Sequence, residues 1–294
     1  LSIRLSHRVF DLLKLPYGLP LIPEIKGVID LYSTSFNRIL ECKKPQNNKN
    51  IETFTNLLED IKIKHTNIED SISKGLKKLD NPLIDYDLIN TELDKFFMSR
   101  IGIRTLISQQ IETANNQDSI IYNCNIKNVL QHSINIVNDL SNQSYGEVPN
   151  IILNTDNIML CYIPSYLSYT IIEVLKNAVV SHISNNVIDN NIEVSVSEGK
   201  YDIIIKISDY GKGFPFKDIS KVMSYSYSTT PRNITKEYEI SNIPIMSGFG
   251  FGLPMARLHC RYFGGDLIIN PMENVGSDVF IYINKLGNEE EKLY

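Results

Sequence analysis

Two polar side chains one helical turn apart form the first candidate site of chemistry. Glu173 and Asn177 are four residues apart in a predicted helix that opens at Pro164-Ser165, so both lie on one face of it. A carboxylate can polarise a hydroxyl group, and a neutral amide oxygen can ligate Mg²⁺, which keeps most of its coordination shell for phosphates and water. Such a pair is also the ordinary solvated face of an amphipathic helix, so the pair alone does not decide between the two interpretations.

A short acidic and glycine-rich motif directly follows an apolar strand predicted at 203–207. Its sequence is Ser208-Asp209-Tyr210-Gly211-Lys212-Gly213. An acid at the end of a strand can accept a hydrogen bond from an exocyclic amine such as that of adenine. Gly211 and Gly213 let the backbone turn tightly beneath a planar base. The alternative is a plain glycine turn capped by Asp209, and the motif by itself leaves both open.

Three glycines at alternate positions, Gly248, Gly250 and Gly252, precede a predicted helix. Their backbone is rich in free N–H groups, and Pro254 suits the first turn of a helix whose positive end would face phosphate. The GxGxG spacing, with no apolar strand directly before it, argues against a dinucleotide-binding fingerprint. The missing Gly-Lys-Ser/Thr argues against a P-loop. The preceding polar segment, 228–247, predicts a lid or binding loop.

The elements that position these motifs differ between the two halves of the chain. In residues 1–147 the apolar residues follow helical spacing, which predicts an antiparallel four-helix bundle with short connections. His65 lies on the apolar stripe of the longest helix, where we expect a hydrogen-bonded seam residue rather than a functional one. The predicted helices cover residues 25–40, 51–79, 91–112 and 126–140.

Residues 148–294 predict a second domain with a mixed α/β layer. Strand patterns are interleaved with helices near 165–184 and 254–263, and the segment 198–200 predicts a hairpin turn. The fold class is therefore α+β, a helical bundle followed by an α/β sandwich. The predicted strands are 192–198, 201–209, 267–269 and 279–283.

The order of the three motifs, ExxxN, DxGxG and GxGxG, resembles the GHKL (Bergerat) nucleotide-binding fold. Histidine kinases, type II topoisomerases, Hsp90 chaperones and the mitochondrial dehydrogenase kinases share this fold. The wording of the motifs resembles pyruvate dehydrogenase kinases in particular, with branched-chain 2-oxo-acid dehydrogenase kinases as close relatives. The resemblance covers nearly the whole chain. It includes residues 93–104, 162–165, 173–178, 208–215, 225–231, 248–263 and 265–267.

The resemblance implies a role for each matching residue. Glu173 is expected to be the general base for a substrate serine, Asn177 to hold Mg²⁺ against the ATP phosphates, and Asp209 to bind adenine. Gly211 and Gly213 are expected to shape the base pocket. The other expected nucleotide-binding residues are Lys176, then Ser228 and Thr229 at the start of the lid, then Gly248, Phe249, Gly250, Phe251, Gly252 and Leu253 around the triphosphate, and Ser277, which stands for the family's Thr in the late Gly276-Ser277-Asp278 motif.

The same resemblance implies an activity and its partners. We expect a protein serine kinase of the mitochondrial matrix that uses Mg-ATP to phosphorylate and inactivate the decarboxylase component of a 2-oxo-acid dehydrogenase complex, with the pyruvate complex as first choice. Expected partners are that component, the lipoyl domain of the acyltransferase core, and a second copy of the chain in a homodimer. The alternatives are a branched-chain 2-oxo-acid dehydrogenase kinase and an ATP-binding adaptor with weakened catalysis.

Three positions depart from the family's pattern. Gln110 replaces a bundle His, which removes the natural phosphoacceptor of a histidine-kinase mechanism. Tyr169 stands where the pyruvate type has a His and resembles the branched-chain type instead. Val180 replaces an Arg near the phosphates, and losing that charge weakens phosphate binding by roughly 1 kcal/mol or more unless Lys176 or Arg232 compensates.

Composition sets limits on the class of protein. With 43% hydrophobic and 21% charged residues, the 294-residue chain has the composition of a globular protein of about two domains. A net charge of −5 argues against a general affinity for nucleic acid. The four cysteines form no CxxC pair, which favours a reducing compartment and argues against a zinc knuckle or a disulfide framework. The sequence contains no run of about 18 apolar residues, so it predicts no membrane span.

Overall fold

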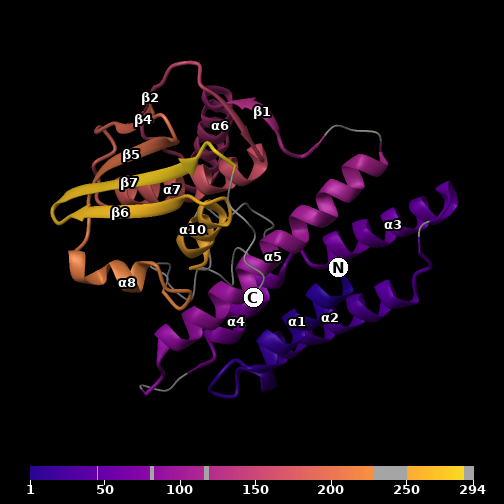
Figure 1. The fold of residues 1–294 in the computed structure, drawn as a ribbon. Helices are drawn as coiled ribbons and strands as arrows, with labels where there is room; N and C mark the ends of the chain where they lie inside the picture. Colours follow the sequence, from indigo (N-terminus) through magenta and orange to yellow (C-terminus); the bar gives the residue numbers. More distant parts are fainter. Residues whose placement is uncertain (45, 80–82, 116–118, 228–249, 288–294) are drawn as a thin grey trace. The chain divides into compact units, whose positions relative to one another are not determined.

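The computed structural model describes residues 1–44, 46–79, 83–115, 119–227 and 250–287. These residues form two compact units, one of residues 1–120 and one that begins at Ile121. Each unit has its own helices and its own buried core, and the expected α+β fold class is confirmed (Figure 1). Within the described ranges, no helix combines the length and the apolar character that a bilayer crossing requires.

The first unit is a helical bundle. Helix α1 packs on α2 and α5, α2 packs on α4, and α3 packs on α5. Apolar side chains at helical spacing fill the space between them, among them Leu12, Ile25, Leu58 and Phe97. The helices are α1 (Ser2–Leu13), α2 (Pro23–Glu41), α3 (Asn48–Lys64), α4 (Ile68–Leu76) and α5 (Tyr86–Ala114), with a short 3₁₀ turn, η1 (Leu19–Leu21), before α2.

The long helix predicted at 51–79 is wrong in one respect, because it is broken at His65 into α3 and α4. The His65 carbonyl accepts a hydrogen bond from the Arg100 guanidinium at 2.7 Å, so it is turned toward α5. Asn67, which has a low helix propensity, then begins the next helix. The apolar stripe continues across the break because three intervening residues amount to nearly one helical turn.

His65 is a buried seam residue, as expected. It is 3% exposed, its Nε2 lies 2.8 Å from the Ser35 hydroxyl, and its ring meets that of Tyr32 edge-on at 4.6 Å. Burial, together with the charges of Arg100 and Arg104, lowers the pKa of His65 to about 3. The ring is therefore neutral in the folded bundle at physiological pH.

This neutral histidine predicts acid sensitivity of the fold. Above pH 6.5 the ring is neutral in both the folded and the unfolded chain. Between pH 6.5 and about 3 only the unfolded chain takes up the proton, so the free energy of unfolding falls as pH falls, by about 2 kcal/mol at pH 5 from this group. Urea unfolding at pH 7.5 and pH 5 should show a smaller loss in His65→Gln than in the wild type. The exposed His132→Gln is the control, and an equal loss in all three proteins would refute the assignment.

Helix α6 (Ile126–Tyr145), which was predicted to be part of the bundle, is grouped by its contacts with the second unit. It packs on α7 (Pro164–Ser184), and its apolar face joins the core of that unit. Helix α1, whose pattern the sequence reading passed over, is the helix that packs with α2 and α5 instead. By contacts, the second unit therefore begins earlier than the domain boundary predicted between residues 147 and 148.

The second unit is an α/β sandwich built on a sheet in the order β2-β4-β5-β7-β6. Among the described strands of this sheet, β2 is parallel to its neighbour β4, and the other pairs are antiparallel. A small sheet pairs β1 with β3. The strands are β1 (Tyr122–Asn125), β2 (Ile151–Asn154), β3 (Met159–Tyr162), β4 (Ile192–Glu198), β5 (Asp202–Lys212), β6 (Asp266–Met272) and β7 (Val275–Asn284).

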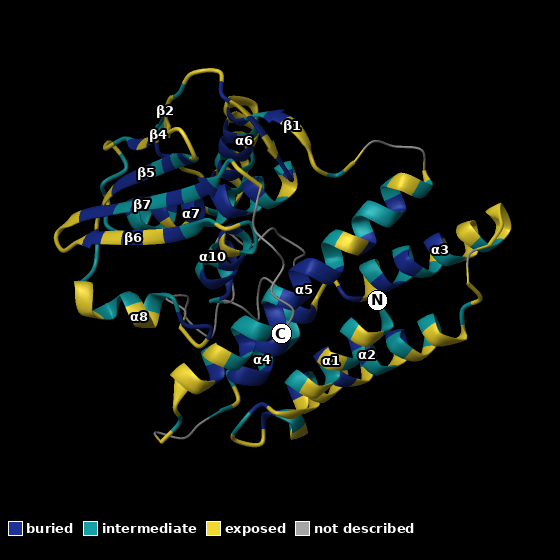
Figure 2. Cartoon of the chain, in the orientation of Figure 1, coloured by how far each residue is buried: buried dark blue, intermediate teal, exposed yellow. Residues whose placement is uncertain are grey.

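One face of this sheet carries the core. Alternate residues of β4, β5 and β7 are buried beneath helices α6, α7 and α10 (Gly252–Tyr262), and Figure 2 shows the alternation along the strands. The predicted hairpin between β4 and β5 is confirmed, with Gly199 N–H bonded to the Asp202 carbonyl. The four predicted strands are present, and β1, β2 and β3 are additions. This layer of helices on one sheet face places α7 against β5 and α10 against β6.

Candidate nucleotide-binding site

A cavity of about 350 Å³ opens in the second unit, lined by residues of all three motifs. Its wall combines the polar face of α7, the end of β5, the β6-β7 pair and the start of α10. The lining residues are Glu173, Val174, Asn177, Ala178, Val180, Ser181, Ser184, Asn185, Ile207, Asp209, Gly213, Phe214, Val222, Tyr227, Gly250, Gly252, Leu253, Ile269, Ser277 and Val279.

The α7 side of the cavity carries the carboxylate and amide pair. Glu173 Oε1 accepts from Lys176 Nζ at 2.9 Å, and both side chains are largely buried. Asn177 donates its Nδ2 to the Glu173 carbonyl at 2.8 Å, which leaves its amide oxygen to serve a ligand. A β-carbon at Gly252 would lie 2.2 Å from Glu173 Oε2. The backbone at Gly252 thus lies directly against the Glu173 carboxylate, and a larger residue there would require that carboxylate to move.

The opposite wall holds a buried acid. Asp209 is 9% exposed, and its Oδ1 accepts from the Gly211 N–H at 2.9 Å. Burial raises the pKa of Asp209 to about 6, although backbone N–H groups of Gly211 and Ser277 stabilise the carboxylate and oppose the rise. An acid that is buried at the wall of a cavity is suited to accept a hydrogen bond from a ligand donor.

The glycines of this wall are required by space. A β-carbon at Gly213, where φ is +55°, would lie 2.2 Å from the Gly276 carbonyl oxygen. A β-carbon at Gly211 would lie 2.0 Å from the Ser181 hydroxyl, and one at Gly276 would lie 1.9 Å from the Asp209 carbonyl oxygen. These distances are far below van der Waals contact, so the backbone of the β5 end, the β6-β7 turn and α7 pack directly on one another.

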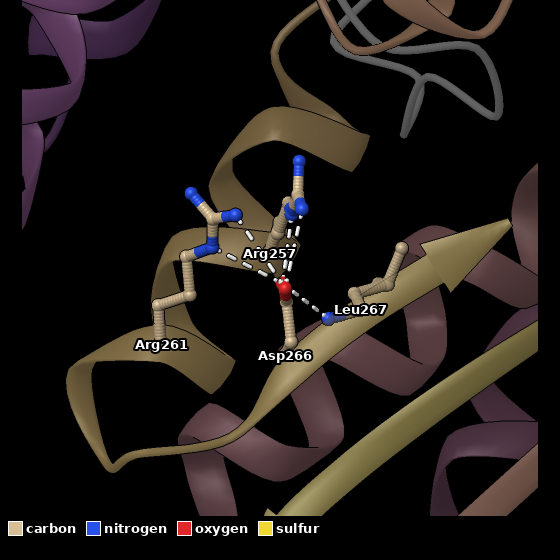
Figure 3. Close-up of polar contacts among 4 residues, drawn as sticks. All are labelled: Arg257, Arg261, Asp266 and Leu267. Atoms are coloured by element: carbon tan, nitrogen blue, oxygen red, sulfur yellow. Dashed lines mark hydrogen bonds and ion pairs between the residues drawn. The ribbon is translucent and has the colours of Figure 1, made fainter.

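Helix α10 is fixed to the sheet by a fork of charges (Figure 3). The Asp266 carboxylate accepts from Arg257 Nε at 2.7 Å, from Arg261 Nε at 3.1 Å and from the Leu267 N–H at 2.8 Å. Burial alone would raise the pKa of Asp266, but the two guanidinium groups outweigh it and the pKa is lowered. This link holds α10 against β6 and so keeps Gly252, at the start of α10, in place beside Glu173.

The structure brings most of the predicted site residues into one cavity. Glu173, Asn177, Asp209, Gly213 and Ser277 line it, as do three residues of the glycine loop, Gly250, Gly252 and Leu253. Lys176 and Gly211 stand behind the wall, bonded to Glu173 and packed on Ser181. Phe251 is buried against the ring of Tyr225, with the ring centroids 5.0 Å apart. Ser228, Thr229, Gly248 and Phe249 lie outside the described residues.

The sequence reading missed the far end of the cavity. Ser181, Ser184 and Asn185 continue the α7 face beyond Asn177, and the apolar side chains of Phe214 and Ile269 close the cavity opposite. The helical spacing 177, 181, 184 was a usable signal, because these positions share a face with Glu173. Val180 also lines the cavity with an apolar side chain.

Comparison with known proteins decides the family. Residues 1–148 match the family model described as mitochondrial branched-chain alpha-ketoacid dehydrogenase kinase. Residues 164–286 match the model described as histidine kinase-, DNA gyrase B-, and HSP90-like ATPase. The chain belongs to the mitochondrial 2-oxo-acid dehydrogenase kinase family. The resemblance read from the motifs is thereby confirmed, and the second unit of this kinase-family chain is a GHKL ATP-binding domain.

Individual relatives of this kinase family match along the whole chain. The mitochondrial pyruvate dehydrogenase (acetyl-transferring) kinase of Arabidopsis thaliana is 30% identical over 311 residues, covering 100% of this chain and 84% of the relative. Isozyme 4 of the kinase from Rattus norvegicus is 32% identical over 318 residues, covering 100% and 76%. The kinase of Schizosaccharomyces pombe is 32% identical over 273 residues, covering 86% and 64%.

Proposed function

We propose that this chain is a protein serine kinase that uses Mg-ATP to phosphorylate, and so inactivate, the decarboxylase component of a mitochondrial 2-oxo-acid dehydrogenase complex. The observation that carries the proposal is the cavity in which Glu173, Asn177 and Asp209 meet the glycine loop. The pyruvate complex is the preferred target, since the relatives above are named pyruvate dehydrogenase kinases. The site of action is the mitochondrial matrix.

The cavity wall supports a division of roles along the nucleotide. Asp209 accepts a hydrogen bond from the exocyclic amine of adenine. The closely packed backbone at Gly211 and Gly213 forms the surface on which the planar base lies. Gly250, Gly252 and Leu253, at the N-terminal end of α10, direct backbone N–H groups toward the triphosphate. Gly248 and Phe249, which lie outside the described residues, stay predicted triphosphate-binding residues.

Glu173 is proposed as the general base. It lies at the cavity wall one helical turn from Asn177, and Lys176 fixes its side chain through the ion pair at 2.9 Å. The serine hydroxyl attacks the γ-phosphorus as Glu173 takes its proton, the bond to the bridging oxygen breaks, and ADP leaves. Phosphoryl transfer needs positioning and charge stabilisation more than covalent help, so no phosphoenzyme is required.

The residues present fit a magnesium ion at Asn177. Its amide oxygen is a hard, neutral ligand whose direction is set by the bond from Nδ2 to the Glu173 carbonyl. Mg²⁺ supplies neutralisation of the charge that develops on the phosphates. In the described part of the chain no group of three or more His, Cys, Asp or Glu side chains offers an all-protein metal site. The proposed ion is held by Asn177 together with the phosphates.

The proposed partners are the decarboxylase component, the lipoyl domain of the acyltransferase core and a second copy of the chain. One feature supports self-association. The sheet face away from α7 carries partly exposed apolar side chains at Ile204, Ile268, Phe280 and Tyr282, which is typical of a surface that another chain covers.

The branched-chain complex is the second candidate substrate. It is favoured by Tyr169, which packs its ring on His259 with the centroids 5.0 Å apart, and by the name of the model that matches residues 1–148. The third candidate, an ATP-binding adaptor with weakened catalysis, is favoured by the apolar Val180 in the cavity wall.

One assay separates these candidates. The chain is incubated with radiolabelled ATP, Mg²⁺ and either the pyruvate or the branched-chain decarboxylase component, and phosphoserine is quantified. We expect faster labelling of the pyruvate component, and its loss in Asn177→Ala. Faster labelling of the branched-chain component would reassign the substrate. ATP binding without transfer to either would leave the adaptor and overturn the kinase proposal.

The raised pKa of Asp209 predicts a pH-dependent preference for adenine. Below a pKa of about 6 the free site carries a protonated acid, whose carbonyl oxygen is a weaker acceptor for the amine than the carboxylate. Affinity for ATP, relative to purine riboside triphosphate, which lacks that amine, should therefore fall by up to about tenfold between pH 7.5 and pH 5. The two ligands share their phosphate ionisations, so the ratio of the dissociation constants isolates Asp209. A ratio that stays constant with pH would contradict the assignment.

A further inference from the structure

The backbone at the end of β5 departs from the sheet. Asp209 pairs with Ser277 and Lys212 pairs with Val275, so the register shifts by one residue between them. Tyr210 and Gly211 form the bulge. Bulges next to functional sites re-aim side chains and leave backbone groups without a ladder partner. The groups released here have to find other partners, because a buried peptide group without one is costly.

Three side chains at the C-terminal end of α7 supply those partners. His182 Nε2 accepts from the Tyr210 N–H at 3.0 Å. The Gly211 carbonyl accepts from the Ser181 hydroxyl at 2.7 Å and from Asn185 Nδ2 at 2.9 Å. Asn185 Nδ2 also donates to the Ser181 carbonyl at 2.9 Å, which ties it to the helix end. We call Ser181, His182 and Asn185 the α7 clamp.

The tautomer of His182 is decided by its partner. The Tyr210 N–H can only donate, so Nε2 must be unprotonated and the neutral ring carries its proton on Nδ1. The side chain is completely buried, and burial lowers the pKa of His182, which keeps the ring neutral. His182 is therefore a fixed acceptor, held by packing and aimed at one peptide group of the bulge.

The clamp acts on the carboxylate that faces the base. Asp209 Oδ1 accepts from the Gly211 N–H, and the carbonyl of that same residue is held by two clamp donors. We propose that the α7 clamp positions Asp209 for recognition of the exocyclic amine of adenine, so that Ser181, His182 and Asn185 are positioning residues for nucleotide selection. This inference rests on the proposed nucleotide site.

The same helix carries both ends of the proposed reaction. His182 lies nine residues after Glu173 on α7, about 13 Å along the helix axis. Helix α7 thus fixes both the proposed general base, Glu173, and the residues that position Asp209 against the adenine ring. The distance between them cannot change without breaking the helix or the clamp, which is the kind of preorganisation that in-line transfer requires.

The preference of the 294-residue chain for one nucleobase over another tests the role of the α7 clamp. Affinities for Mg-ATP and for purine riboside triphosphate are measured by titration calorimetry at pH 7.5. His182→Leu removes the acceptor, whereas His182→Gln places an amide oxygen at similar reach. We expect the wild-type preference for ATP to fall about fivefold to tenfold in His182→Leu, the worth of one buried hydrogen bond, and to return in His182→Gln.

A matched control separates positioning from stability. Ser133→Ala removes a different buried hydrogen bond of the same unit, to Ser168 at 2.9 Å, and should lower stability while keeping the preference for ATP. If His182→Leu does not fold, Ser181→Ala with Asn185→Ala tests the carbonyl side of the clamp by the same ratio. A folded clamp variant that keeps the full preference overturns the clamp alone. If the wild type binds both nucleotides equally, then neither the proposed recognition of the adenine amine by Asp209 nor the proposed role of the clamp holds.

Discussion

Glu173→Gln is expected to lower the rate of phosphoryl transfer to serine by about 10² to 10⁴-fold, the usual worth of a positioned general base, while ATP affinity stays within about twofold. Glutamine has the same shape, so it still fits beside Gly252, where a β-carbon would lie only 2.2 Å from the carboxylate. Its amide oxygen still accepts from Lys176. What it cannot do is take the proton of the attacking hydroxyl.

Single-turnover transfer and calorimetric ATP binding are the two measurements. Glu147→Gln, an exposed position of the same unit, is the matched control and should behave as wild type. Because Lys176 is 11% exposed at its side chain and loses its ion partner, Glu173→Gln also costs about 1–3 kcal/mol of stability. Adding Lys176→Met should recover that stability without recovering transfer. Wild-type transfer by Glu173→Gln would remove Glu173 from the mechanism.

The predictable part of this molecule is the part determined by local pattern. Glu173 and Asn177 share a face because four residues make one helical turn, and that holds wherever the helix packs. Asp209 lies near the end of β5, directly after the apolar run of that strand. Glu173, Asn177 and Asp209 all line one cavity. Their grouping was predicted from the order of the three motifs along the chain.

The unpredicted part depends on contacts between distant residues. At the break in the helix, the His65 carbonyl accepts a hydrogen bond from Arg100, which lies 35 residues away in the sequence. Helix α6 has an apolar face that a bundle or a sheet could bury equally well, and only its packing on α7 decides. The bulge at Tyr210 and Gly211 leaves no mark in the hydrophobic pattern, so neither the bulge nor its clamp could be read from spacing.

Gly213→Ala is expected to be the most damaging glycine substitution in the site. Two effects add at this position. The backbone φ of +55° disfavours any β-carbon, and that atom would lie 2.2 Å from the Gly276 carbonyl oxygen and 2.4 Å from that of Met272. Both contacts are with main chain, which cannot rotate away. We expect a loss of roughly 3 kcal/mol or more in the free energy of unfolding, together with loss of ATP binding.

Gly287→Ala separates the two effects. Gly287 has nearly the same φ, +59°, but a β-carbon there meets nothing within 4 Å. Alanine at 287 should therefore cost only the conformational strain, about 1 kcal/mol, and leave ATP binding unchanged. Urea unfolding and calorimetry on both variants give the difference that belongs to the close approach of the β5 end to the β6-β7 turn. Equal losses at the two positions would mean that glycine is necessary at 213 because of the backbone conformation, and not because of the close contact with the carbonyl oxygens of Gly276 and Met272.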